Sequence, residues 1–163
     1  MPVTFNANEI FEIAEEIERN GAEFYRKAAE QTSDKETKQL LDDMATIEDG
    51  HLETFKSMRA ELSGEDIGWT VFDPNNEAAL YLRAIADARG WEGKVSPMEP
   101  LTGNETTTEI LETALCSEKE SVLFYFGLKA LVPDNAGKDK VENIIIEELK
   151  HITTILEKLK ALG

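Results

Sequence analysis

Six side chains able to bind a metal ion recur in two matching sets along this sequence. Each set has a glutamate, a second glutamate thirty residues later and a histidine three residues after that, and the sets lie one hundred positions apart. They are Glu18, Glu48 and His51 in the first half and Glu118, Glu148 and His151 in the second. A Glu and a His three residues apart project from one face of a helix. Two such helices, opposed by two helices with one glutamate each, predict a carboxylate-bridged site for two metal ions.

Aromatic residues repeat at the same offset, so the repeat is more than an accident of a glutamate-rich composition. A Phe-Tyr pair follows the first glutamate of each set at the same distance, as Phe24 and Tyr25 and again as Phe124 and Tyr125. Aromatics make up only 7% of the sequence, which makes the repeated pair specific. Tyr25 and Tyr125 either donate hydrogen bonds to the ligand carboxylates from outside the ligand set or are ordinary core aromatics.

The glutamate and histidine pairs lie within the apolar stripes of their predicted helices. Apolar residues from Met44 to Leu62 recur at steps of three and four, and Glu48 and His51 occupy two of these steps. Such a stripe faces the protein core. Four buried carboxylates without positive charge would be costly and would repel one another, whereas two divalent cations would neutralise them. Carboxylates with one imidazole per ion favour two iron ions, or manganese, over a thiolate-bound structural zinc.

Four long amphipathic segments make up most of the sequence, and none alternates like a strand. The first is predicted at about 7–31, and the second runs from a capping box of Ser33 and Glu36 to about Leu62. The third lies between Asn104 and Pro133, and the fourth runs from a cap at Asp134 or Asn135 to the end. Short turns within each pair predict two antiparallel hairpins. The connection 63–104 is rich in Gly and Pro, with helical spacing at 76–89. We therefore predict an all-α, ferritin-like four-helix bundle with a long crossover that contains a short extra helix.

Composition limits the classes of partner. With 163 residues, 41% of them hydrophobic, the sequence predicts one domain, 1–163. The net charge of −16 argues against nucleic acid and anionic membrane surfaces as partners. No apolar run is long enough to span a bilayer and residues 1–8 do not resemble a secretory signal, so we expect a cytoplasmic protein. The single cysteine, Cys116, excludes an intramolecular disulfide or a CxxC redox pair within this sequence.

The order single Glu, Glu-x-x-His, single Glu, Glu-x-x-His on four predicted helices resembles the rubrerythrin family of the ferritin-like superfamily. The segment 16–30 is similar to the first-helix pattern of that family, and the resemblance covers 8–31, 34–62, 105–131 and 138–161. It implies a di-iron centre that reduces hydrogen peroxide, or reacts with oxygen, in the cytoplasm, and we expect a homodimer. The six repeated glutamates and histidines match the family ligands position by position, so catalysis would pass through the metals that they hold.

Two departures from the family pattern matter for function. Rubrerythrins carry a rubredoxin domain with four iron-binding cysteines, whereas this sequence has one cysteine, so we expect electrons from an external donor such as a rubredoxin. Rubrerythrins also have a further carboxylate one turn after the third-helix ligand, where this sequence has Ser121, matched by Gly21 in the first half. The redox-linked ligand exchange of the family is therefore in doubt here. Both small residues would leave room beside the metals for a small substrate.

Two other classes of function remain open. The same site could be a ferroxidase that feeds iron storage, which the formation of a hollow cage would reveal. Alternatively, the metal could only stabilise a helical binding module, in which case the reduced protein would be inert to peroxide and oxygen.

Overall fold

The computed structural model describes residues 7–62, 80–82, 84 and 101–163, and every regular element within them is helical. The long helices are α1 (Ala7–Gln31), α2 (Lys35–Ala60), α4 (Thr107–Leu131) and α5 (Lys138–Leu162), and a 3-10 turn, η2 (Asp134–Ala136), precedes α5. The predicted all-α fold class is confirmed.

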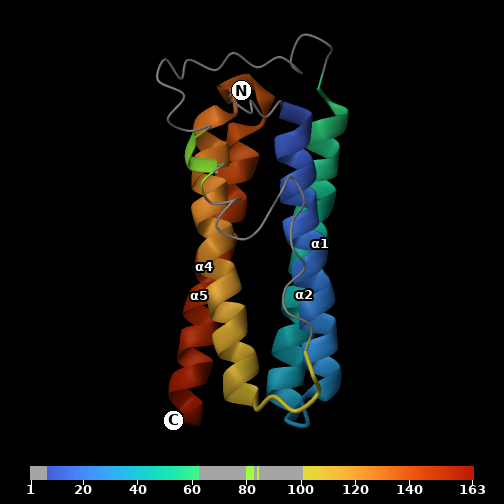
Figure 1. Cartoon of the computed structure of the whole chain (residues 1–163), viewed down its shortest axis with the longest axis vertical. Coiled ribbons are helices and arrows are strands. Elements are labelled where there is room, and N and C mark those ends of the chain that lie inside the picture. The colour runs from blue at the N-terminus through green and yellow to red at the C-terminus, as the bar shows by residue number, and fades with distance from the viewer. Residues whose placement is uncertain (1–6, 63–79, 83, 85–100) are drawn as a thin grey trace.

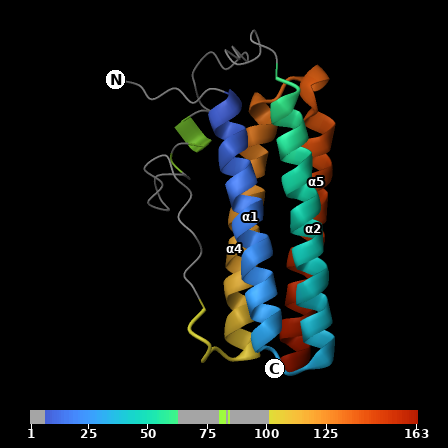
Figure 2. The same cartoon turned by 90° about the vertical axis from the view of Figure 1, so that its right-hand side faces the viewer.

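The helices form two antiparallel hairpins, α1 with α2 and α4 with α5, which stand side by side (Figures 1 and 2). Across the bundle, α1 packs beside α4 and α2 beside α5. Helix α4 begins at the end of the bundle where α1 ends, so α2 and α4 run in the same direction (Figure 1). Such a topology needs a connection that returns along the bundle, as predicted for 63–104. Most of that connection, including most of the helix expected at 76–89, lies outside the described residues, but 80–82 and Ala84 are helical.

The ends of two helices differ from the sequence prediction. The N-cap of α2 is Asp34 and not Ser33, because the Asp34 carboxylate accepts a hydrogen bond from the backbone N–H of Thr37 at 2.9 Å. An anionic cap also interacts favourably with the positive end of the helix dipole. Helix α5 begins at Lys138, after the expected caps, because Gly137 has a φ of 95° and separates η2 from α5.

A capping box defines the start of α4. The Thr106 side chain accepts a hydrogen bond from the backbone N–H of Glu109, and the Glu109 carboxylate accepts one from the backbone N–H of Thr106 at 2.7 Å. This reciprocal pair satisfies two backbone donors that the first turn of a helix leaves unpaired. It places the helix start inside the region predicted from Asn104 onward.

Two apolar cores occupy opposite ends of the bundle. One core includes Phe11, Phe55, Tyr125 and Val141, and the other includes Phe24, Leu41, Leu111 and Ile155. On each long helix, one end contributes to the first core and the other end to the second. The glutamates and histidines singled out in the sequence lie between these ends, so they meet midway along the bundle with apolar packing on both sides.

The short helical stretch 80–82 packs against α4 at Gly127. A Cβ atom at Gly127 would lie 2.6 Å from Cδ1 of Tyr81 and 2.7 Å from Cδ2 of Leu82, which is too close for any side chain. Leu82 is buried, and the Tyr81 hydroxyl donates a hydrogen bond to the Leu123 carbonyl at 2.7 Å. The close approach therefore requires glycine at this position of α4.

Among the described helices, none combines the length and the apolar character needed to cross a bilayer.

Candidate metal centre

The six residues predicted as ligands meet at one level of the bundle. One comes from α1, one from α4 and two each from α2 and α5, and every one of them is at most 5% exposed. They are Glu18, Glu48, His51, Glu118, Glu148 and His151. The inward orientation predicted from the apolar stripes is therefore observed for all six.

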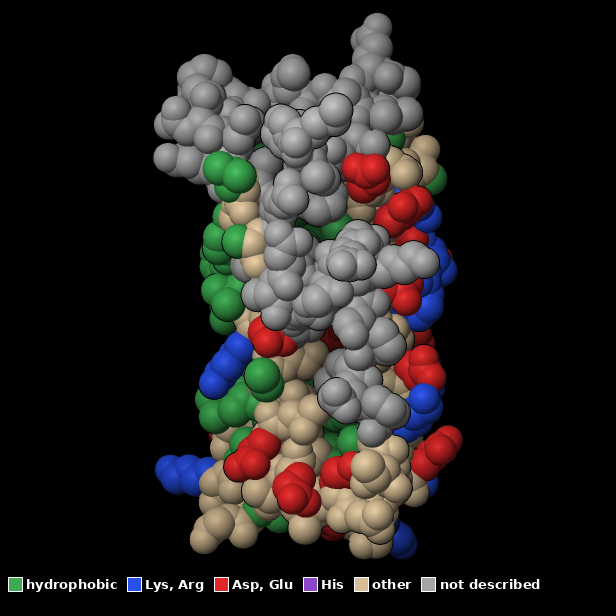
Figure 3. Space-filling model, viewed as in Figure 1, with side chains coloured by type: hydrophobic (Ala, Val, Ile, Leu, Met, Phe, Trp, Pro, Cys, Tyr) green, Lys and Arg blue, Asp and Glu red, His purple; other side chains and the backbone are tan. Residues whose placement is uncertain are grey.

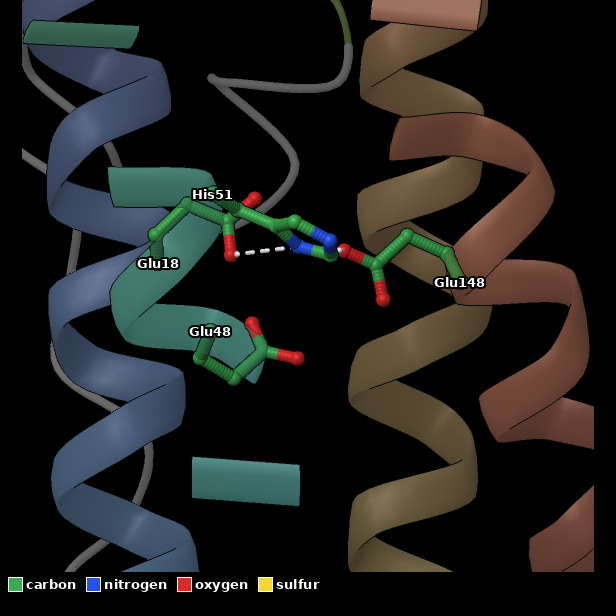
Figure 4. Close-up of side chains that lie close together, drawn as sticks. All are labelled: Glu18, Glu48, His51 and Glu148. Atoms are coloured by element: carbon green, nitrogen blue, oxygen red, sulfur yellow. Dashed lines mark ion pairs between the residues drawn. The ribbon is translucent and has the colours of Figure 1, made fainter. Parts of the chain in front are cut away.

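The first group of side chains surrounds His51, as Figure 4 shows. The Nδ1 atom of His51 lies 3.0 Å from Oε1 of Glu148 and 3.4 Å from Oε2 of Glu18. The Glu48 carboxylate completes this group, in which one oxygen or nitrogen from each residue lies within 4.8 Å of the others. Four donor atoms this close together could all bind one metal ion.

The second group surrounds His151 in the same way. Its Nδ1 atom lies 3.1 Å from Oε2 of Glu148, 3.2 Å from Oε1 of Glu48 and 3.3 Å from Oε1 of Glu118. Donor atoms of these four residues again lie within 4.8 Å of one another. Glu48 and Glu148 belong to both groups, whereas each of the other four residues belongs to one. Two adjacent ions could therefore each have a private Glu and His and share two bridging carboxylates.

Burial raises the pKa of three of the four glutamates. The pKa values of Glu18 and Glu48 are raised well above the ordinary value, first by burial and then by the charges of neighbouring glutamates. Burial and the Glu148 charge raise the pKa of Glu118 to about 8. For Glu148, burial acts in the same direction, but hydrogen bonds to His151 and His51 outweigh it and lower the pKa. When no metal ion is bound, the raised pKa values mean that the cluster keeps protons on its carboxyl groups.

Both histidines are held as cations when no metal is bound. Burial alone would lower their pKa values, but the surrounding carboxylates outweigh it. Hydrogen bonding to Glu148 is the largest of these opposing effects at His51, and the pKa rises to about 9. At His151, hydrogen bonding to Glu118 leads and the pKa rises to about 12. The site thus attracts positive charge strongly, which is the property that a metal centre needs.

Five buried donor atoms in the cluster make no well-aligned hydrogen bond among the described residues, although Nδ1 of His51 contacts Oε1 of Glu148 at 3.0 Å. They are Oε2 of Glu18, Oε1 of Glu48, Oε1 of Glu148, Nδ1 of His51 and Nε2 of His151. An unsatisfied buried polar atom typically costs about 1–3 kcal/mol. All five atoms belong to residues of the two four-residue groups. The donor set therefore fits a pair of divalent cations.

The two repeated tyrosines donate hydrogen bonds across the bundle. The Tyr25 hydroxyl donates to Oε1 of Glu118, and the Tyr125 hydroxyl donates to Oε1 of Glu18, so each tyrosine contacts the glutamate of the opposite hairpin. Burial is the main cause that raises the pKa of both phenols well above the ordinary value, so both remain protonated donors. Each bond fixes one oxygen of a carboxylate and leaves the other oxygen available to a cation.

Glu147 is a contact of the site that sequence reasoning missed. Its Oε2 atom lies 2.6 Å from Nε2 of His51, and its side chain is 49% exposed. At the matching position the first half has Ile47, and Nε2 of His151 has no hydrogen-bond partner among the described residues. Glu147 and His51 line a groove of about 720 Å³ between α2 and α5. Only a comparison of the two halves residue by residue could have singled out this glutamate.

A small cavity lies beside Glu48 and Glu118. It has a volume of about 10 Å³, and its lining includes Gly21, Tyr25, Glu48, Glu118 and Ser121. A Cβ atom at Gly21 would lie 3.1 Å from Oε2 of Glu48, so glycine keeps this side open. The volume corresponds to about one water molecule. The room predicted from the two small residues is present.

The rubrerythrin family model matches residues 3–59, which include α1 and nearly all of α2. A solved structure from Thermotoga maritima, described as a ferritin-like diiron-carboxylate protein, aligns with a TM-score of 0.72 and 23% sequence identity and covers 100% of both chains. Among curated proteins, none matches the sequence at a significant level. These findings confirm the resemblance predicted from the sequence: the chain is similar to rubrerythrins over residues 3–59 and has the ferritin-like fold.

Proposed function

We propose that this protein binds two iron ions at the buried glutamate and histidine cluster and reduces hydrogen peroxide or oxygen with electrons from an external donor. The observation that carries the proposal is the pair of four-residue donor groups that share Glu48 and Glu148. Glu18 and His51 would hold one ion, and Glu118 and His151 the other. Bound there, the iron pair would supply two electrons and Lewis acidity to a small oxidant.

The residues around the donors support a small substrate. The cavity beside Glu48 and Glu118 has room for about one water molecule, so it favours the smallest oxidants, such as peroxide or oxygen, over larger compounds. Tyr25 and Tyr125 hold one oxygen of Glu118 and Glu18 respectively, so the single-glutamate ligands would keep their orientation during the reaction. The apolar cores close the site toward both ends of the bundle, and the groove lined by His51 and Glu147 opens it on the side between α2 and α5.

The source of electrons and the cellular location are proposed from the resemblance to rubrerythrins. One peroxide takes up two electrons and two protons to give two waters, and these 163 residues contain one cysteine, too few for the four-cysteine site of a rubredoxin. We therefore assign electron supply to a separate donor such as a rubredoxin. A cytoplasmic location and a homodimer complete the proposal, and manganese is the alternative metal.

The test combines metal content with a single turnover. Protein reconstituted with ferrous iron under anaerobic conditions should contain about two iron ions per chain, and about one equivalent of peroxide should oxidise both. Glu48→Gln should lose this stoichiometry, whereas Glu53→Gln, on the exposed face of α2, should keep it. One iron per chain would contradict the shared-ligand arrangement. A reduced protein inert to peroxide and oxygen would identify the site as structural, and a hollow cage with an iron core would identify a ferroxidase.

A further inference from the structure

The outer face of the second hairpin exposes five large apolar side chains. Leu123 and Phe126 lie on α4, and Ile146, Leu149 and Leu156 on α5, each between 45% and 51% exposed. We refer to these five residues as the α4–α5 face. Figure 3 shows hydrophobic side chains gathered along the edge of the molecule beside α4. Scattered exposed apolar residues are normal, but five on two adjacent helices form a patch that needs an explanation.

The first hairpin is an internal control for this face. At the five matching positions, one hundred residues earlier, it has Glu23, Arg26, Thr46, Asp49 and Lys56. Arg26 forms an ion pair with Asp49 between α1 and α2, at the positions that correspond to Phe126 and Leu149. Glu23 and Lys56 also form ion pairs within their own helices. Because the same hairpin shape is built with a polar surface here, folding alone does not require the apolar side chains of the second hairpin.

The spacing of the α4–α5 face favours a helical partner. On α5, Ile146, Leu149 and Leu156 stand at steps of three and seven, and on α4, Leu123 and Phe126 are three apart. These are the a and d spacings of a heptad, in which apolar side chains of one helix insert between those of another. An extended peptide or a flat surface would not select this spacing.

The charges around the α4–α5 face further limit which partner can bind there. The chain carries a net charge of −16, so two copies repel each other over most of their surfaces. Over 116–130 and 146–160, the heptad positions beside these five residues are Cys116, Lys119, Ala130, Thr153 and Lys160, none of which is acidic. The same spacing reaches acidic residues only near the start of each helix, at Glu109, Glu112, Asp139 and Glu142. Two copies can therefore approach through the middle of this face without opposing carboxylates, and Lys119 and Lys160 can meet acidic residues at the ends of the stripe on the other copy.

The area is suited to self-association. Five side chains of this size at about half exposure present roughly 500 Å² of apolar surface, at the upper end of the largest patches on typical monomers. With the polar rim included, such a patch approaches the roughly 800 Å² per partner of a standard interface. An interface with two-fold symmetry uses the same patch on both chains, so the required match is self-complementarity alone.

We propose that a second copy of this chain docks on the α4–α5 face, so that the α4–α5 hairpins of two protomers pack against each other. This deepens the homodimer named above and rests on that part of the proposed function, but it is independent of the metal. Metal content and oligomeric state can be measured on the same sample, so the failure of one leaves the other standing.

The first hairpin supplies the decisive variant. Phe126→Arg combined with Leu149→Asp transfers the Arg26–Asp49 pair to the matching positions of the second hairpin, where the backbone already has the same shape. Sedimentation velocity should show a dimer for the wild type and a monomer for this variant, with the dissociation constant raised at least about 100-fold. The control Arg26→Ala with Asp49→Ala should remain dimeric. Circular dichroism and the melting temperature report whether the variant is folded.

A second measurement keeps the proposal testable if the double variant does not fold. Phe126 replaced by photoreactive p-benzoyl-phenylalanine, which nearly preserves its shape, should crosslink to a second copy and give a product of twice the chain mass. The same replacement at Arg26 should not. A wild type that stays monomeric at about 100 μM, well above the micromolar dissociation constants of specific complexes, would overturn the proposal. A dimer unaffected by the double substitution, or crosslinked equally from both positions, would overturn it as well.

Discussion

Nε2 of His51 lies 2.6 Å from Oε2 of Glu147, and within the described part of the chain this contact has no counterpart at His151, because the position that matches Glu147 is Ile47. The two halves of the site therefore have the same inward donor residues, but only the His51 half has a glutamate that contacts the outward nitrogen of its histidine, as far as the structure is described. With Nδ1 turned toward Glu18 and Glu148, Nε2 of His51 can donate its hydrogen to Glu147. Such a support fixes the ring orientation and raises the basicity of the inward nitrogen.

The first prediction is that Glu147 strengthens metal binding on the His51 side. Glu147→Gln should lower the affinity for one of the two bound ions by about 10- to 100-fold, the usual effect of losing the hydrogen-bond partner of a ligand histidine. Titration of Mn²⁺ against a competing chelator should show one weakened site and one unchanged site. Glu157→Gln, an exposed glutamate on the same helix, is the control. Two unchanged affinities would show that the Glu147 contact is incidental.

The second prediction uses the opposite pKa shifts of the two shared glutamates. Burial raises the pKa of Glu48, whereas hydrogen bonds from both histidines lower that of Glu148. In metal-free protein, Glu48→Gln should raise the melting temperature by roughly 2–4 °C, equivalent to about 1 kcal/mol, because it removes an unfavourable buried carboxyl. Glu148→Gln should lower it, because it leaves the histidine cations without their partner. Calorimetry in the presence of a chelator measures both, and equal shifts of the same sign would refute the assignment.

The third prediction is that metal-free protein loses stability as the pH rises. The folded protein keeps a proton on Glu118 up to about pH 8, against an ordinary value of 4.5, and on His51 up to about pH 9, against 6.5. The unfolded chain releases these protons earlier, so the free energy of unfolding should fall between about pH 5 and pH 9. The lowered pKa of Glu148 has the opposite sign, but its contribution is complete above pH 4.5 and constant over this range.

Urea unfolding of metal-free protein at several pH values tests this directly. The metal-bound protein is the control, because cations replace the protons and should flatten the dependence over the same range. A metal-free protein whose stability rises toward pH 9 would mean that the glutamates are ionised in the absence of metal.

The fourth prediction concerns the two buried tyrosines. Tyr25→Phe or Tyr125→Phe removes one hydrogen bond to Glu118 or Glu18 and should destabilise the protein by about 1–3 kcal/mol. Each should also lower the affinity for one metal ion, because the carboxylate loses its fixed orientation. Tyr81→Phe is the matched control, since among the described residues the Tyr81 hydroxyl donates its hydrogen bond to the Leu123 carbonyl, away from the metal site. A control that weakened metal binding as much as the buried variants would show a non-specific effect.

The fifth prediction concerns the cavity beside Ser121. Ser121 is buried, its hydroxyl donates a hydrogen bond to the Ser117 carbonyl at 3.1 Å, and its side chain lines the cavity. Ser121→Val should reduce the rate of iron oxidation by peroxide at least about tenfold, because the added methyl groups fill a space of about one water. The iron content should stay at about two per chain. An unchanged rate would place substrate entry elsewhere, and a lost metal would show that the substitution disturbs the ligands.

The sequence alone determined the helices, the inward face of each and the six candidate ligands. These are local properties: the 3.6-residue period places Glu48 and His51 in the apolar stripe of their own helix, and the internal repeat transfers this placement to Glu148 and His151. Short turns predicted the two hairpins, and the long connection between them predicted their arrangement in a four-helix bundle. Helix caps were less certain because Ser33 and Asp34 are both good capping residues, and the choice depends on local hydrogen bonds.

Tertiary structure alone decided which residues meet between helices. Glu48 and Glu148 serve both donor groups, the tyrosines cross to the opposite hairpin, and Glu147 reaches His51 from another helix. The α4–α5 face likewise exists only because two helices bring Phe126 and Leu149 to one side of the hairpin. Such contacts depend on the relative rotation and height of packed helices, which no period within a single helix specifies.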